Sequence, residues 1–238
     1  MDAAPSTPLS YQSSQSGANL VDRRSDGGGK IRGANAQVAP VKLRLPASQV
    51  CQDFPVCQSP GAMTMPEEER ELFAGRRFRV VQRIQLSSGG RSLPREVILH
   101  PGAVVVVPLA PADQVCLIRN ERIAVGKTLI ELPAGTMEPP TPPLEMAIRE
   151  LQEETGYSAG RWHELPGFFM SPGILCERMH VFVAEDLAPG APAREEGEQI
   201  ENLLVNWDEA LRMVDRGQIE DAKTIAALLM CERWRRQN

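Results

Sequence analysis

The chain has 238 residues, of which 42% are hydrophobic and 24% are charged, and its formal net charge is −5. This composition is ordinary for a globular protein and predicts one full domain with an appendage, or two small domains. A mildly acidic balance argues against nucleic acid as a partner, because nucleic-acid binding relies on Lys and Arg against phosphates. The longest apolar run, 103–112, is interrupted by two prolines and falls well short of the ~20 residues that cross a bilayer, which argues against a membrane partner.

The first 66 residues differ in composition from the rest. Ser, Gln, Gly, Ala and Pro dominate them, with neither a helical nor a strand period. Such a segment buries too little apolar surface to offset its ordering entropy, so residues 1–66 are predicted to be a disordered, low-complexity extension. Met63 and Met65 precede the patterned region, and a start at either is an alternative to Met1. The lack of a signal-peptide pattern and the scattered, unpaired cysteines favour a cytoplasmic location.

The patterned region begins near residue 76 and reads first as strands. Two segments around the turn 88–90 predict a strand pair, and the apolar, β-branched run 103–109 predicts a buried strand. The further predicted strands are 115–119, 127–132, 178–185 and 200–207; the strand pair itself consists of 78–84 and 95–100.

Helices are predicted between and after these strands. The clearest covers 144–155, with Thr141 as its cap, Pro142 in its first position and Gly156 at its end. Its apolar stripe is Leu144, Ile148 and Leu151. Two more helices, 208–216 and 221–235, are separated by a break at Gly217. Interleaved strands and helices indicate a layered α/β or α+β domain.

An acidic cluster marks the first helix. Glu150, Glu153 and Glu154 share one helical face, because side chains three and four residues apart are neighbours. Their mutual repulsion is costly unless a cation lies among them. Arg149 is one such cation, and a hard divalent ion, Mg²⁺ above all, is another. The helix by itself favours a solvated acidic face over a cation site.

The residues around this helix form a longer motif. The stretch Glu131-Leu132-Pro133-Ala134-Gly135 precedes the helix, and Arg149-Glu150-Leu151-Gln152-Glu153-Glu154-Thr155-Gly156-Tyr157 closes it. Together they resemble the Nudix box. This motif consists of a glycine, five residues of any kind, a glutamate, seven further residues of any kind, and then the sequence Arg-Glu-apolar-x-Glu-Glu-x-Gly-apolar. One residue departs: Thr141 stands where the box has its first glutamate, which in the family supports the helix and its charges. Glu145, four residues before Arg149, can pair with it instead.

Other segments narrow the resemblance to ADP-ribose pyrophosphatases. They are 100–104, 171–173 and 221–228, and the resemblance covers about 76–235. It implies a Nudix-type α/β/α sandwich with a mixed sheet over 101–238. It also implies a small antiparallel N-terminal sheet, a ribbon over 76–100 through which the chain forms a homodimer.

The resemblance also implies a reaction and a cofactor. ADP-ribose would be hydrolysed to AMP and ribose 5-phosphate with Mg²⁺, or Mn²⁺ in its place, held by Glu150, Glu153, Glu154 and the Ala134 carbonyl. Arg149 would orient Glu150 beside the metal. The catalytic set would be completed by Glu198, a water-orienting base in the acidic loop before Ile200, with Glu196 as the second choice.

The remaining implications concern the substrate, a small-molecule nucleoside diphosphate sugar. Arg122 keeps an arginine suited to a bidentate phosphate contact, and Arg95 and Glu177 stand at substrate-binding positions of the family. Two alternatives stay open. One is a pyrophosphatase of another nucleoside diphosphate sugar, and the other is a non-catalytic ADP-ribose sensor on the same fold.

Overall fold

The computed structural model describes residues 69–194 and 199–238. These residues belong to the second of two compact units, which spans residues 46–238. The predicted extension 1–66 lies outside the described residues, as do Glu196 and Glu198. Within the described ranges, no helix combines the length and the apolar character needed to cross a membrane.

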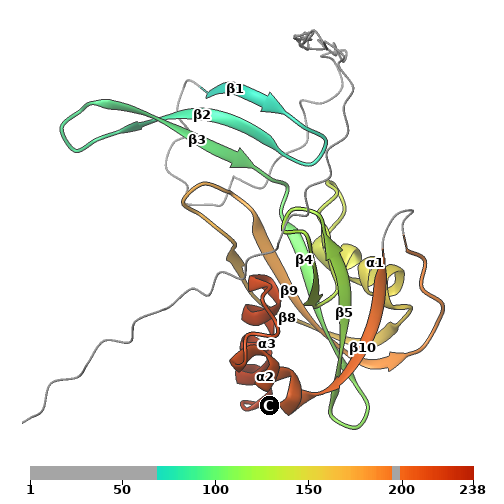
Figure 1. Ribbon diagram of the computed structural model, residues 1–238. Coiled ribbons are helices and arrows are strands. Elements are labelled where there is room, and N and C mark those ends of the chain that lie inside the picture. Colours follow the sequence, from blue (N-terminus) through green and yellow to red (C-terminus); the bar gives the residue numbers. More distant parts are fainter. Residues whose placement is uncertain (1–68, 195–198) are drawn as a thin grey trace, which may run out of the picture. The chain divides into compact units, whose positions relative to one another are not determined.

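A three-stranded antiparallel sheet opens the described region (Figure 1). It consists of β1 (Glu69–Ala74), β2 (Arg79–Leu86) and β3 (Ser92–Leu99) in that order. The pairing of β2 with β3 confirms the predicted strand pair. β1 was not predicted, because all six of its residues are exposed and show no alternation. Pairing with β2, with ion pairs such as Arg83 to Glu69 at 2.9 Å, orders it instead.

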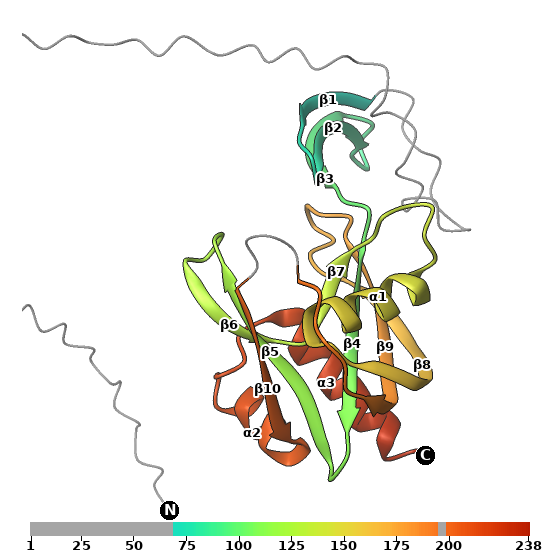
Figure 2. The same ribbon diagram turned by 90° about the vertical axis from the view of Figure 1, so that its right-hand side faces the viewer.

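The second sheet has seven strands and is mixed, as predicted. Its main path runs β10-β5-β4-β9-β8, with β6 beside β5 and β7 beside β4 (Figure 2). β4 pairs with β9 in parallel, and the other pairs are antiparallel. The strands are β4 (Ala103–Ala110), β5 (Gln114–Arg122), β6 (Lys127–Glu131), β7 (Ala134–Thr136), β8 (Ser158–Phe169), β9 (Arg178–Ala188) and β10 (Ile200–Asn206).

β8 is a long strand that the sequence pattern did not predict. It contains Gly160, Pro166 and Gly167, which weaken any strand signal. The strand lies at the edge of the sheet, and its register against β9 shifts between Leu165 and Phe168. Proline is tolerated at an edge and at such an irregularity, because no ladder hydrogen bond is lost there.

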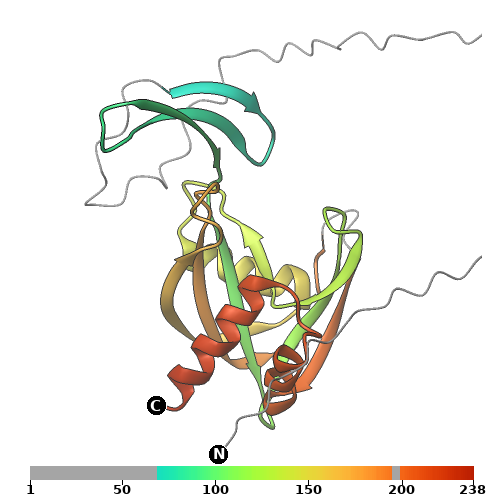
Figure 3. The same cartoon turned by 60° about the vertical axis from the view of Figure 1, so that its left-hand side comes forward.

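Helices cover both faces of this sheet, which confirms the α/β/α sandwich (Figures 1 and 3). α1 (Pro143–Thr155) packs on one face, where Val104 and Val106 of β4 contribute to its core. α2 (Trp207–Asp215) and α3 (Ala222–Arg235) pack on the other, over Val105 and Val107. β4 is therefore buried on both sides, which explains its continuous apolar run.

The predicted apolar stripe of α1 was correct for Leu151 and wrong for its other two residues. Leu144 and Ile148 are 40% and 43% exposed, and the buried face is formed by Met146, Ala147 and Leu151. The helix is rotated so that Glu154 also faces inward, where its Oε2 accepts a hydrogen bond of 3.0 Å from the Ala134 backbone N–H.

The start and the end of α1 differ in how well the sequence predicted them. Pro142 is the N-cap, not Thr141, because Pro143 restricts the residue before it to extended backbone. The helix ends as predicted at Gly156, whose φ of +81° lies in the left-handed region.

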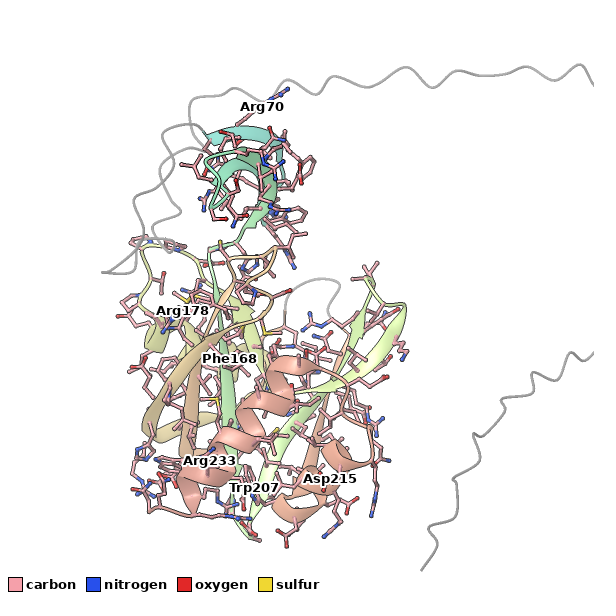
Figure 4. The ribbon with its side chains drawn as sticks, turned by 90° about the vertical axis from the view of Figure 1, so that its left-hand side faces the viewer. Arg70, Phe168, Arg178, Trp207, Asp215 and Arg233 are labelled. Atoms are coloured by element: carbon pink, nitrogen blue, oxygen red, sulfur yellow. The ribbon has the colours of Figure 1, made fainter. Side chains whose placement is uncertain are left out.

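Hydrogen bonds fix the two C-terminal helices to each other and to the end of β6. Trp207, labelled in Figure 4, starts α2 and donates from Nε1 to Glu232 of α3 at 2.7 Å. Asp221 caps α3 by accepting from the Thr224 N–H at 3.0 Å. The Thr224 hydroxyl accepts in turn from the Leu132 N–H at 2.8 Å, so the start of α3 is fixed against the end of β6.

Candidate active site

A cavity of about 390 Å³ lies where α1 meets the loop after β7. Its acidic lining consists of the three box glutamates of α1 and Glu138, and its basic lining consists of Arg122 of β5 with two arginines from the β1–β2 turn. The lining residues are Arg76, Arg77, Pro101, Asn120, Arg122, Ala134, Gly135, Thr136, Met137, Glu138, Pro139, Glu150, Glu153 and Glu154. The structure therefore brings together the predicted Ala134, Glu150, Glu153, Glu154 and Arg122.

The carboxylates of α1 lie directly against β7. Glu154 is only 4% exposed and accepts the hydrogen bond from Ala134 described above. A Cβ on Gly135 would stand 1.9 Å from Oε1 of Glu150, so the Glu150 carboxyl occupies the space that any side chain there would fill. This close approach is the physical reason for glycine as the first residue of the box.

These oxygens suit a divalent cation that takes the rest of its coordination sphere from other oxygen ligands. Among residues 69–194 and 199–238, no three His, Cys, Asp or Glu side chains converge as a ready metal cage. Mg²⁺, however, usually takes one or two carboxylates and completes its sphere with water and substrate phosphates. The donor set of Glu150, Glu153, Glu154 and the Ala134 carbonyl consists only of hard oxygens, and all four residues line one cavity. The residues present therefore fit such an ion.

Arg149 has a different partner from the predicted one. Its Nη1 donates to Oε2 of Glu138 at 2.8 Å, and the predicted pair with Glu145 is not formed. The hydrogen bond to Glu138, followed by the charges of Glu138, Glu153 and Glu150, raises the pKa of Arg149. The guanidinium of Arg149 therefore stays charged beside the acidic cluster, while its hydrogen-bond partner, Glu138, is not one of the three glutamates of that cluster.

A buried charged network supports the basic lining of the cavity, and sequence reasoning missed most of it. Arg122 donates from Nε and Nη2 to the two oxygens of fully buried Glu131, at 2.8 and 2.6 Å. Lys223 bonds the same carboxylate and lies 2.9 Å from Asp221. Burial raises the pKa of Glu131, but the bonds from Arg122 and the charge of Lys223 outweigh it, so the pKa lies below its usual value.

Signals for this network existed in the sequence. Glu131 ends a strand beside the box, and Lys223 belongs to the C-terminal segment 221–228 that resembles the family. Neither observation could predict that the two side chains form a pair, because Lys223 and Glu131 are 92 residues apart in the chain. Asn120 and the pair Arg76 and Arg77 carried no signal of their own.

Two other predicted residues, Glu177 and Arg95, do not line the cavity of the box glutamates. Glu177 lines a neighbouring cavity of about 270 Å³ that also contains Arg122 and Lys223. Arg95 lies on β3, donates to Gln85 at 3.0 Å and does not line the cavity of the box glutamates. Glu198 lies outside the described residues.

The residues just before and just after the acidic loop that contains Glu198 are nevertheless bonded to α1. The Ala193 N–H donates to the Glu153 carbonyl at 3.0 Å, and Arg194 Nε donates to the Glu154 carbonyl at 3.1 Å. On the other side, Asn202 donates to the Thr155 carbonyl at 2.8 Å. The residues on either side of the acidic loop are therefore fixed to the last turn of the helix that carries the box glutamates.

The NUDIX domain matches residues 99–228 of this chain. The chain therefore belongs to the NUDIX family and is a Nudix hydrolase. Enzymes of this family generally use divalent metal ions.

Relatives agree with this assignment. The chain is 35% identical over 163 residues to the ADP-ribose pyrophosphatase of Bacillus subtilis (strain 168), covering 67% of this chain and 88% of that protein. It is 34% identical over 161 residues to the methanol dehydrogenase activator of Bacillus methanolicus, covering 66% and 86%. It is 36% identical over 137 residues to the GDP-mannose pyrophosphatase of Escherichia coli O139:H28, covering 53% and 71%.

A solved structure shares the fold. The crystal structure of an ADP compounds hydrolase superposes with a TM-score of 0.61 at 23% identity, covering 72% of this chain and 96% of that one. At this identity the likeness concerns the fold alone.

Proposed function

We propose that this chain hydrolyses the pyrophosphate bond of ADP-ribose, giving AMP and ribose 5-phosphate, with Mg²⁺ as the cofactor and Mn²⁺ as a substitute. The observation that carries the proposal is one cavity lined both by Glu150, Glu153 and Glu154 and by the arginines at 76, 77 and 122. An acidic lining suits a cation and a basic lining suits phosphates. The match with the Bacillus subtilis relative covers 88% of that protein, which is an ADP-ribose pyrophosphatase, and this supports the same substrate here.

The residues have distinct tasks in this proposal. Glu150, Glu153, Glu154 and the Ala134 carbonyl would hold the cation, and a bound cation would screen the pyrophosphate charge and lower the pKa of the attacking water. Arg122, oriented by its two bonds to Glu131, presents a cation to phosphate.

The water-orienting base is assigned to Glu198. The box glutamates are engaged as ligands, so a carboxylate from another element must take the proton. The assignment is supported by the flanking residues Ala193, Arg194 and Asn202, which are bonded to the end of the helix that carries the box glutamates. Glu198→Gln should lower kcat by ~10²-fold with little change in KM, because a general base acts mainly in the transition state. Glu196→Gln is the matched control, and a loss confined to that variant would move the assignment to Glu196.

The deciding experiment is a substrate panel. Purified protein is incubated with ADP-ribose, GDP-mannose and other nucleoside diphosphate sugars, with Mg²⁺, with Mn²⁺ and with excess chelator, and products are separated by chromatography. AMP and ribose 5-phosphate should form from ADP-ribose only with the divalent ion, and Glu154→Gln should abolish most turnover while keeping the fold. Full activity in chelator would overturn the metal assignment.

The second candidate substrate is GDP-mannose, favoured by a relative of that name at 36% identity. A higher kcat/KM on GDP-mannose than on ADP-ribose would select it. Tight binding of ADP-ribose without turnover would instead indicate a sensor.

We also propose that the chain forms a homodimer through its N-terminal sheet. This three-stranded sheet buries few of its own residues. It leaves large apolar side chains exposed, namely Leu72, Phe73, Phe78 and Leu86. In the dimer the ribbon of one protomer borders the site of the other, where Arg95 would meet substrate. Light scattering after gel filtration tests the mass, and a monomer that retains full activity would refute the proposal.

The domain division is a further proposal. Residues 76–100 serve dimerisation, residues 101–238 carry the hydrolase, and residues 1–62 are dispensable for both. Deletion of 1–62 should leave the melting temperature and turnover unchanged, and a large loss of either would contradict it.

A further inference from the structure

Thr141 stands where the box has a glutamate that supports the helix and its charges, so this chain must supply that support from another residue. The structure shows where a replacement comes from: Arg149 Nη1 is bonded to Oε2 of Glu138 at 2.8 Å. Glu138 stands three residues before Thr141, in the loop that joins β7 to α1. The pair thus links this loop to the middle of the helix that carries the acidic cluster.

The backbone around Glu138 is fixed on both sides. The Met137 N–H donates to the Gly102 carbonyl at 2.9 Å, and the Thr141 N–H donates to the Glu138 carbonyl at 2.9 Å. Met137 itself is buried in the core under α1. The Glu138 side chain therefore starts from a defined point on the rim of the cavity, so less freedom is lost when it bonds Arg149.

The charges around Arg149 explain why its partner matters. Glu150 and Glu153 both contribute to the electrostatic field at Arg149, so the guanidinium offsets part of their repulsion. An arginine without another partner would pair directly with one of them, since Glu153 lies four residues further along the same helix face. Such a pair would occupy carboxylate oxygens that a cation needs.

We propose that Glu138 takes over the task of the missing box glutamate and acts as a positioning residue. It holds Arg149 close enough to offset the charge of Glu150 and Glu153, and keeps it off their metal-binding oxygens. This inference rests on the proposed function, because it concerns the divalent cation at the same cavity.

The pair itself adds little to folding. The side chains of Glu138 and Arg149 are 65% and 41% exposed, and exposed ion pairs contribute little to stability. Its loss should therefore change metal binding much more than the melting temperature.

The test uses three variants: Glu138→Gln, the double variant Glu138→Gln with Thr141→Glu, and Glu145→Gln as the matched control. Glu145 carries the same charge and precedes Arg149 by one helical turn, but does not bond it. Mn²⁺ binding to each protein without substrate is measured by calorimetry, and melting temperatures are measured in excess chelator. The Mg²⁺ concentration that gives half-maximal turnover is a further readout.

Glu138→Gln should weaken Mn²⁺ binding by about tenfold, in the range found when residues behind metal ligands are removed. Its melting temperature should move by less than about 2 °C, because the pair is exposed. Glu145→Gln should bind Mn²⁺ as the natural protein does. The glutamate restored at residue 141 should recover most of the lost affinity.

Equal losses in Glu138→Gln and Glu145→Gln would overturn the proposal, because they would reveal a general effect of negative charge. Failure of the restored glutamate to recover binding, or unchanged binding in Glu138→Gln, would overturn it as well. If the natural protein binds Mn²⁺ and only the Glu138 effect is missing, the proposed function stands and this inference falls. If the natural protein binds no Mn²⁺, the metal assignment and the inference fall together.

Discussion

Gly135→Ala is the most direct test of the site, because it adds one methyl group in the space that the Glu150 carboxyl occupies. The new Cβ would stand 1.9 Å from Oε1 of Glu150, whereas ordinary contact begins at 3.4 Å. The carboxyl must therefore retreat by about 1.5 Å, and a misplacement of ~1 Å can cost a reaction ~10²-fold. We expect kcat on ADP-ribose to fall by roughly that factor at saturating Mg²⁺.

The fold should survive this change. The atoms that must move belong to a long side chain on the rim of a cavity, and the Gly135 backbone is not left-handed. Alanine in place of glycine in compatible backbone also restricts the unfolded chain, which contributes about 0.4–1 kcal/mol of stability. Urea unfolding should therefore give a free energy within about 1 kcal/mol of the natural protein.

Two controls complete the experiment. Gly89→Ala makes the same substitution where nothing lies within 4 Å, and it should leave kcat unchanged. Glu150→Gln should remove activity, and adding Gly135→Ala to it should cost little more, because both changes act through one side chain. A Gly135→Ala enzyme with natural kcat, or full additivity in the double variant, would refute the reasoning.

Three further predictions concern the structure around the site. Glu131→Gln should cost about 2–3 kcal/mol at pH 7, because it leaves buried cations without their carboxylate. The pKa of Glu131 is lowered in the folded state, so its contribution to stability is present above about pH 4.5 and is lost as the pH falls below that value. Between pH 7 and pH 3.5 the variant should therefore lose less stability than the natural protein, as measured by urea unfolding. Gly156→Ala should cost about 1–3 kcal/mol, because φ is +81° and the new Cβ would meet the Gly190 carbonyl at 2.5 Å; an unchanged melting curve would contradict this. Asp221→Ala should lower the free energy of unfolding by about 0.5–2 kcal/mol, because it removes the side chain that caps the Thr224 N–H. Urea unfolding measures this loss, and an unchanged free energy would contradict the prediction.

Local signals in the sequence determined several elements of the fold. The β-branched run of β4, the turn between β2 and β3, and the end of α1 at Gly156 were all predicted correctly. Each depends on residues within one turn or one strand, such as the left-handed backbone that only glycine adopts cheaply. The box spacing likewise placed Glu150, Glu153 and Glu154 on one helix, because the motif is contiguous with that helix.

Tertiary structure decided what depends on partners distant in the chain. β1 and β8 are strands because β2 and β9 supply their hydrogen bonds, although their own residues lack alternation. The rotation of α1, which exposes Leu144, follows from the core it packs on and from the bond between Glu154 and Ala134.

The same holds for the charges around the site. Local spacing favoured Glu145 as the partner of Arg149, yet the loop before the helix brings Glu138 there instead. Glu131 meets Lys223 across 92 residues because the start of α3 is fixed against the end of β6. Helical spacing states which side chains can meet along one element, whereas ion pairs between elements depend on the packing of the whole domain.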